Sequence, residues 1–160
     1  MKISPANSPE HFDIARTLFR EYQASLNIDL CFQSFEEELA GLPGKYAPPA
    51  GRLLMAFMDD STPAGVIAMR PIDDEICEMK RLYVRPLARG HNLGRQMIDR
   101  LLVEARLCGY KKMRLDTLTG LMDKAIALYR SYGFYDIAPY YNSPLNNELF
   151  LELDLTKARR

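Results

Sequence analysis

The segment from Glu75 to Gly109 constrains the fold most, because its apolar period changes from strand to helix across a short turn. Its first part, Ile76 to Val84, is apolar on both alternating faces. One face carries Ile76, Leu82 and Val84, and the other carries Cys77, Met79 and Tyr83. This pattern is typical of an inner strand that is covered on both sides. Pro86 ends the predicted strand because proline has no amide proton to donate.

The second part of the segment is a glycine-bearing turn followed by an amphipathic helix. The helical stripe comprises Leu93, Met97, Ile98, Leu101, Leu102 and Ala105, and Gly109 is the predicted C-cap. The first amides of a helix have no intrahelical partner and carry partial positive charge, so the turn is a candidate phosphate site. Arg89 and Arg95 would add charge-assisted hydrogen bonds. The alternative is an ordinary connection with two solvated arginines.

Length and charge exclude several classes of protein. With 160 residues, we expect one domain that spans residues 1–160. The chain has 21 basic and 21 acidic residues, so no overall field attracts nucleic acid or an anionic membrane. No apolar run approaches the roughly 20 residues that span a bilayer. The N-terminus lacks a signal sequence, so we expect a cytoplasmic protein.

The three cysteines do not form a metal-binding pattern. Cys31, Cys77 and Cys108 are odd in number and widely spaced. We therefore expect reduced, mostly buried thiols and no metal site.

The remaining chain predicts alternating strands and helices. Expected strands cover residues 2–6, 52–58, 64–72, 112–117, 134–138 and 149–155, and expected helices cover residues 9–26, 34–41 and 122–132. Ser8 and Pro9 form a helix start, and Ser34 with Glu37 predicts a capping box. The short turns that precede the central strand predict antiparallel neighbours. The succession of central strand, helix and next strand predicts a parallel pair.

Two motifs in this order resemble the GNAT superfamily of acyl-CoA-dependent N-acyltransferases. The first is Arg89-Gly90-His91-Asn92-Leu93-Gly94, similar to the pyrophosphate motif of that family, with Asn92 in place of the middle glycine. Asparagine tolerates positive φ, so the turn survives. The second is the stretch 125–134, which resembles the Ala…Leu-Tyr…Gly-Phe signature. Met122 stands where the family has an asparagine that holds the cofactor backbone, so the resemblance does not imply this contact here.

The resemblance implies an α+β, three-layer fold. Its central sheet has about seven mostly antiparallel strands, helices on both faces and a parallel pair around the cofactor. The implied co-substrate is acetyl-CoA. Its pantetheine arm is expected to pair with the main chain of Leu82, Tyr83 and Val84, where a backbone amide also binds the oxyanion. Its pyrophosphate is expected on Arg89, Gly90, His91, Asn92, Leu93, Gly94 and Arg95.

Acetyl transfer to an amine needs a base, because a lysine-like amine has a reference pKa of about 10.4. Glu78 is the candidate, since a carboxylate inside the central strand needs a partner or a task. The alternative is a structural ion pair with Lys80, Arg81 or Arg70. Tyr129 matches the signature tyrosine and is the candidate proton donor to the thiolate, with core packing as its alternative.

The acceptor site is expected on the first two helices, the loop Pro43 to Gly51 and the loop Tyr140 to Pro144. Tyr22, Tyr140 and Tyr141 are the candidate contacts with a small-molecule or peptide amine. The acidic run 36–38 is expected to be a solvated face, and capping or turn chemistry is expected for Asp116 and Thr117. A monomer or homodimer is expected. The rival function is a non-catalytic acyl-CoA-binding sensor or interaction module.

Overall fold

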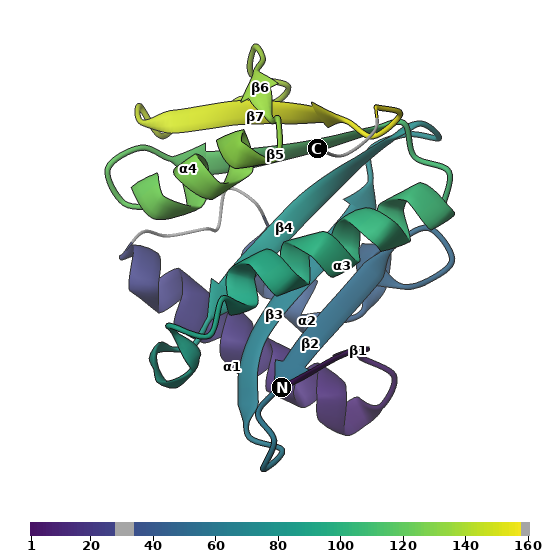
Figure 1. Cartoon of the computed structure of the whole chain (residues 1–160), viewed down its shortest axis with the longest axis vertical. Helices are drawn as coiled ribbons and strands as arrows, with labels where there is room; N and C mark the ends of the chain where they lie inside the picture. Colours follow the sequence, from purple (N-terminus) through teal and green to yellow (C-terminus); the bar gives the residue numbers. More distant parts are fainter. Residues whose placement is uncertain (28–33, 158–160) are drawn as a thin grey trace.

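A seven-stranded sheet organises the chain in the computed structural model, which describes residues 1–27 and 34–157 (Figure 1). The strands are β1 (Lys2–Pro5), β2 (Arg52–Phe57), β3 (Pro63–Pro71), β4 (Ile76–Val84), β5 (Lys112–Leu118), β6 (Tyr135–Asp136) and β7 (Glu148–Asp154). Their order is β1-β2-β3-β4-β5-β7-β6. Only β4 and β5 are parallel, and the other neighbours are antiparallel. The predicted mixed sheet is confirmed.

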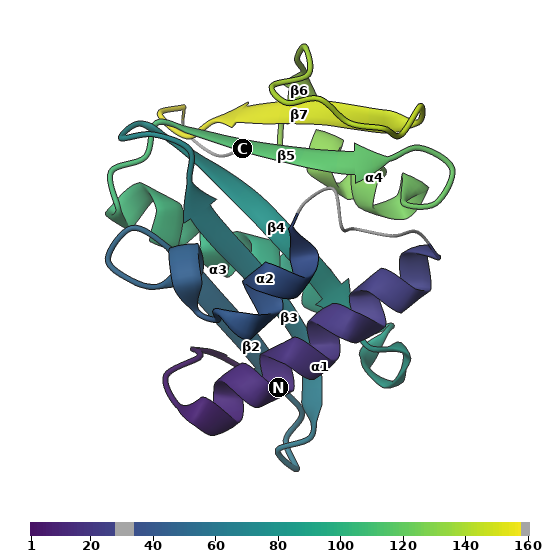
Figure 2. The same cartoon turned by 180° about the vertical axis from the view of Figure 1, so that it is seen from behind.

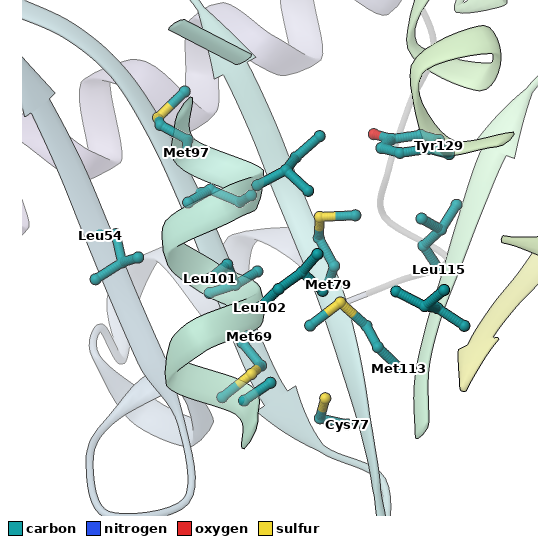
Figure 3. Close-up of a cluster of buried hydrophobic side chains, with 14 of the residues drawn as sticks. Leu54, Met69, Cys77, Met79, Met97, Leu101, Leu102, Met113, Leu115 and Tyr129 are labelled. Carbon is teal, nitrogen blue, oxygen red and sulfur yellow. The ribbon is translucent and has the colours of Figure 1, made fainter. Parts of the chain in front are cut away.

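Helices cover both faces of this sheet. The elements are α1 (Pro9–Leu26), α2 (Phe35–Ala40), α3 (Leu93–Leu107) and α4 (Asp123–Ser131), with short 3-10 turns at η2 (Gly44–Tyr46) and η3 (Pro86–Ala88). Helices α3 and α4 lie on the face seen in Figure 1, and α1 and α2 lie on the face seen in Figure 2. One apolar core forms under α3 and α4 (Figure 3), and a second forms under α1 and α2. The predicted three layers are therefore present.

The two predicted helix starts have different outcomes. Ser8 caps α1, since its hydroxyl accepts a hydrogen bond from the His11 amide at 3.2 Å. Ser34 precedes α2 with a φ of 57° and makes no side-chain capping bond, so the predicted capping box with Glu37 is wrong. A capping Ser needs extended backbone to aim its oxygen at the following amides, and Ser34 is left-handed instead.

A bulge in β4 changes which side chains face each core. Lys80 pairs with Ala68 and Tyr83 pairs with Val66, so β4 has an extra residue between these pairs. Arg81 accommodates it with a φ of 63°. The predicted alternation is therefore wrong beyond the bulge: Cys77, Met79, Leu82 and Val84 share the core under α3, and Tyr83 packs in the core under α1.

The bulged residue is bound to α2 through a buried ion pair. Arg81 donates to both Glu38 oxygens, each at 2.9 Å, and its guanidinium lies 5.0 Å from the centre of the Phe35 ring. The side chains of Arg81 and Glu38 are only 2% and 13% exposed. The prediction of a solvated acidic face is wrong at Glu38 because this arginine reaches it from β4.

Other boundaries differ by a few residues. β6 covers Tyr135–Asp136 only, which is shorter than the predicted strand 134–138. Cys77 is buried and Cys108 is half-buried, and burial raises the pKa of the Cys77 thiol to about 12; Cys31 lies outside the described residues. In the part of the chain that the structure describes, no helix has the length and apolarity needed to cross a membrane.

We predict that Gly51→Ala destabilises the protein. An added Cβ would lie 2.3 Å from the Lys45 carbonyl oxygen and 2.5 Å from the Tyr46 carbonyl carbon, so backbone would have to move. The expected cost is about 1–3 kcal/mol, measured as a Tm several degrees lower. The control is Gly41→Ala, where the nearest atom is 3.4 Å away and the effect should be within about 0.5 kcal/mol. Equal melting temperatures for the two variants would contradict this packing.

Candidate active site

Strands β4 and β5 separate, and their separation creates a gap in the sheet. They pair only at Ile76 with Lys112, Cys77 with Met113 and Glu78 with Arg114. Beyond these pairs β5 continues alongside β7 while β4 diverges, as Figures 1 and 2 both show. A pocket occupies this β4–β5 gap and is lined by residues that include Tyr22, Met79, Lys80, Leu82, Asp116, Tyr129 and Glu148.

Among the described residues, no strand pairs with this edge of β4 from Met79 onward. Backbone groups on such an edge need hydrogen-bond partners, and an extended ligand can supply them by adding as a strand. The predicted residues Leu82, Tyr83 and Val84 lie on this part of β4. The Leu82 side chain lines the gap, whereas Tyr83 points towards α1 and donates a 3.3 Å hydrogen bond to Glu21.

The start of α3 lies one short connection beyond β4. The first helical hydrogen bond runs from the Gln96 amide to the Asn92 carbonyl at 3.2 Å, so the amides of Leu93, Gly94 and Arg95 precede the helical pattern. Asn92 has a φ of 60°, as the sequence predicts for this substitution, and Gly90 has a φ of 87°. These amides and the helix dipole suit an anion.

The side chains at the start of α3 differ in their exposure and in their contacts. Arg89, Gly90, His91 and Asn92 are exposed, and Leu93 is buried beneath them. The Arg95 guanidinium stacks 5.4 Å from the centre of the Tyr132 ring. Tyr132 in turn donates to Asp99 at 2.6 Å, so its hydroxyl has a structural role. A Cβ at Gly94 would meet no atom closer than 4.0 Å, which leaves its outer side open to a ligand.

Tyr129 projects from α4 towards β4, as its hydroxyl oxygen shows in Figure 3. The residue is 4% exposed, lines the gap and packs against Phe134 with ring centres 5.8 Å apart. Burial raises the pKa of Tyr129 above that of a free phenol, so its hydroxyl keeps its proton at neutral pH. Met122 is the N-cap of α4, and its sulfur accepts a 3.5 Å hydrogen bond from Thr117.

Glu78 has two partners and is 2% exposed. One carboxylate oxygen accepts from Arg70 Nε at 2.9 Å, and the other accepts from the Tyr140 hydroxyl at 2.6 Å. Glu78 is not among the residues that line the gap. These contacts correspond to the structural alternative, an ion pair with Arg70. The role of Glu78 as base stays a prediction.

The three tyrosines predicted to contact the acceptor lie close to these groups. Tyr22 lines the gap, packs edge-on against Tyr83 at 6.4 Å, and has its pKa raised to about 12 by burial. Tyr140 and Tyr141 bond to carboxylates of the protein instead, Tyr140 to Glu78 and Tyr141 to Asp116 and Glu148. Their hydroxyls are therefore engaged within the chain.

Three residues that line the gap were not predicted as site residues from the sequence: Lys80, Asp116 and Glu148. The Lys80 ammonium lies 3.9 Å from Asp116, and the two side chains are 3% and 11% exposed. The expectation of capping or turn chemistry for Asp116 is wrong, because it belongs to a buried polar cluster at the gap. The available signal was a charge at every second position, Glu78 and Lys80 on one strand and Arg114 and Asp116 on the next. Among the described residues, no group of metal-ligating side chains could hold an ion.

Comparisons with known proteins identify the family. Residues 13–134 match the model of the acetyltransferase (GNAT) family. An uncharacterized N-acetyltransferase of Schizosaccharomyces pombe is 38% identical over 158 residues, 98% of this chain and 96% of that protein. The chain therefore belongs to the GNAT family and is an acetyl-CoA-dependent N-acetyltransferase.

Solved structures share the fold at lower identity. An acetyltransferase from Streptococcus agalactiae has a TM-score of 0.78 and 23% identity, covering 96% of this chain and 97% of its own. The spermidine N-acetyltransferase of Vibrio cholerae in complex with CoA and spermine has a TM-score of 0.71 and 15% identity, covering 98% and 96%.

We predict that Gly94→Asp weakens acetyl-CoA binding. A carboxylate at the start of α3 should repel the pyrophosphate, at a cost of about tenfold or more in Kd. Calorimetry should also show wild-type affinity falling at high salt. The control is Leu107→Asp, which adds the same charge at the exposed far end of α3. Equal affinity in Gly94→Asp and Leu107→Asp would place the pyrophosphate elsewhere.

Proposed function

We propose that this protein transfers an acetyl group from acetyl-CoA to a primary amine of a small-molecule acceptor, by direct attack in a ternary complex, and that residues 1–160 act as one catalytic domain. The observation that carries the proposal is the open edge of β4, which leads into the amide-rich start of α3. An extended thioester with a pyrophosphate has complementary chemistry: polar groups for a strand edge and an anion for a helix start.

In this proposal the pantetheine arm lies along β4 and carries the thioester into the gap. A backbone amide among Leu82, Tyr83 and Val84 stabilises the oxyanion. Tyr129 donates its proton to the departing thiolate, because burial keeps the phenol protonated. Holding both substrates in one gap makes a covalent enzyme intermediate unnecessary.

The amine is proposed to enter where Tyr22 lines the gap. Tyr22 offers an aromatic face to a cationic or polar amine, and the Asp116 carboxylate lines the same gap. Spermine, the ligand of the Vibrio cholerae enzyme, is an amine of this chemistry and a suitable first probe.

The rival function is a non-catalytic acyl-CoA-binding module. It needs the open edge of β4 and the start of α3, but has no use for a buried proton donor in the gap. A thiol-release assay with acetyl-CoA and a panel of primary amines separates the two. Transfer to any amine of the panel supports the enzyme, and binding without transfer supports the module.

We predict that Tyr129→Phe lowers kcat and leaves the Kd for acetyl-CoA nearly unchanged. The substitution keeps the ring against Phe134 and removes the proton donor. General acids typically contribute about 10²–10⁴-fold, and because thiolates leave readily we expect the lower end. Tyr110→Phe is the control, since that hydroxyl binds the Ala50 carbonyl outside the gap. Wild-type kcat in Tyr129→Phe, with chemistry limiting the rate, would assign Tyr129 to packing.

The two roles open to Glu78 predict different pH dependences. If Glu78 is the base, Glu78→Gln slows transfer, and the defect shrinks as pH rises because more of the amine is already deprotonated. If Glu78 is structural, Glu78→Gln lowers the Tm, and any loss of activity is equal at every pH. Arg70→Gln is the matched variant, because it breaks the same 2.9 Å ion pair and leaves the carboxylate in place. If Glu78 is the base, this pH dependence appears in Glu78→Gln and not in Arg70→Gln; the same pH-independent loss in both variants would assign Glu78 to the ion pair with Arg70.

A further inference from the structure

A single tyrosine hydroxyl bridges two carboxylates at the β4–β5 gap. Tyr141 lies in the loop between β6 and β7, and its hydroxyl contacts Asp116 Oδ2 on β5. The same hydroxyl lies 2.7 Å and 3.1 Å from the two oxygens of Glu148, the first residue of β7. Asp116 and Glu148 both line the gap, so the bridge borders the proposed reaction site.

The Tyr141 hydroxyl has one hydrogen to donate, and it contacts two carboxyl groups. A phenol has one hydrogen to donate, and an ionised carboxylate can only accept. Tyr141 can therefore satisfy one carboxylate as donor, and its contact with the other is favourable only if that carboxyl group carries a proton. The geometry therefore favours one proton on the Asp116–Glu148 pair in addition to the phenolic proton, as in other sites where two carboxyl groups lie close together.

The surroundings locate this proton on Glu148. Burial alone would raise the pKa of Asp116, but the Lys80 ammonium 3.9 Å away, the hydrogen bond from Tyr141 and the Arg81 guanidinium together lower it. Burial raises the pKa of Glu148, and the negative Asp116 acts in the same direction. Tyr22, Tyr129 and Tyr140 also interact with Asp116 and are neutral at pH 7. Hydrogen bonds from Ser143 and Tyr141 lower the pKa of Glu148, but burial and Asp116 outweigh them.

We propose that Asp116, Tyr141 and Glu148 form a proton relay that takes the proton from the attacking amine and delivers it to solvent. The relay rests on the acetyl transfer proposed above and provides a proton acceptor that lines the gap. Glu148 is half-buried and therefore reaches solvent, whereas Asp116 is the inner member.

The proton balance of the relay closes in one cycle. Glu148 first releases its proton to solvent. Asp116 then accepts a proton from the ammonium form of the acceptor, which frees the nitrogen lone pair to attack the thioester carbon. Asp116 then donates to the Tyr141 oxygen while Tyr141 donates its own proton to Glu148, which restores the starting state. The thiolate receives a different proton, from Tyr129; the remaining proton on the nitrogen is released to solvent as the amide forms, and Tyr129 regains a proton from solvent.

The shared proton is tested without any acceptor by NMR titration of carboxyl carbons in ¹³C-glutamate-labelled protein. Glu148→Gln identifies the Glu148 signal. We expect Glu148 to titrate above ordinary glutamates in the wild type and to move back towards them in Asp116→Asn. An ordinary Glu148 titration, unchanged in Asp116→Asn, would show that no proton is shared and would overturn the proposal.

The transfer role is tested by pH–rate profiles of Tyr141→Phe with spermine and the other amines of the panel. We expect kcat to fall about tenfold or more near pH 7, to recover as pH rises, and the Kd for acetyl-CoA to stay within about twofold. The control is Tyr135→Phe, which removes another tyrosine–carboxylate bond, to Glu152, away from the gap and should retain wild-type kcat.

The outcomes separate this relay from the proposed function. Wild-type kcat in Tyr141→Phe at every pH, or an equal loss at every pH with a lower Tm, would overturn the relay while acetyl transfer stands. No transfer by the wild type to any amine would overturn the proposed function and the role of the relay in it, whereas the NMR titration would still decide whether the proton is shared.

Discussion

The separation of β4 from β5 is the constraint on which the rest of the structure depends. Parallel strands normally satisfy each other along their length, yet here the ladder ends after Glu78 and Arg114. Backbone groups on the edge of β4 beyond this point need partners other than β5, because a buried backbone group without a partner costs free energy comparable to a lost hydrogen bond. The backbone groups of such an edge can pair with an extended ligand.

Buried charges hold the two sides of the gap in place. Arg81 ties the bulge of β4 to Glu38 of α2, and Lys80 faces Asp116 across the gap. Removing one partner of a buried pair typically costs about 3–5 kcal/mol, although the intact pair adds little net stability over an apolar packing. These pairs therefore specify where β4 lies more than they stabilise the fold. Lys80 and Arg81 also lower the pKa of Asp116, which lines the gap.

Local signals in the sequence predicted most of the fold and part of the site. Apolar periodicity predicted the strands and helices to within a few residues. The prediction that Asn92 tolerates a positive φ is confirmed. The bulge at Arg81 was not predictable, because it has no glycine and depends on Glu38, which lies 43 residues earlier. The cluster of Asp116, Tyr141 and Glu148 is similarly long-range: a loop and two strands must be placed before its proton count becomes visible.

Hydrogen exchange of backbone amides, measured by mass spectrometry with and without acetyl-CoA, tests most directly whether the gap is the cofactor site. We expect slower exchange in peptides that cover Met79 to Val84 and Gly90 to Arg95 when acetyl-CoA is added. We expect little change in β1 and β2, which lie at the far side of the sheet. Unchanged exchange in both of these segments, under conditions where calorimetry shows saturated binding, would contradict the account.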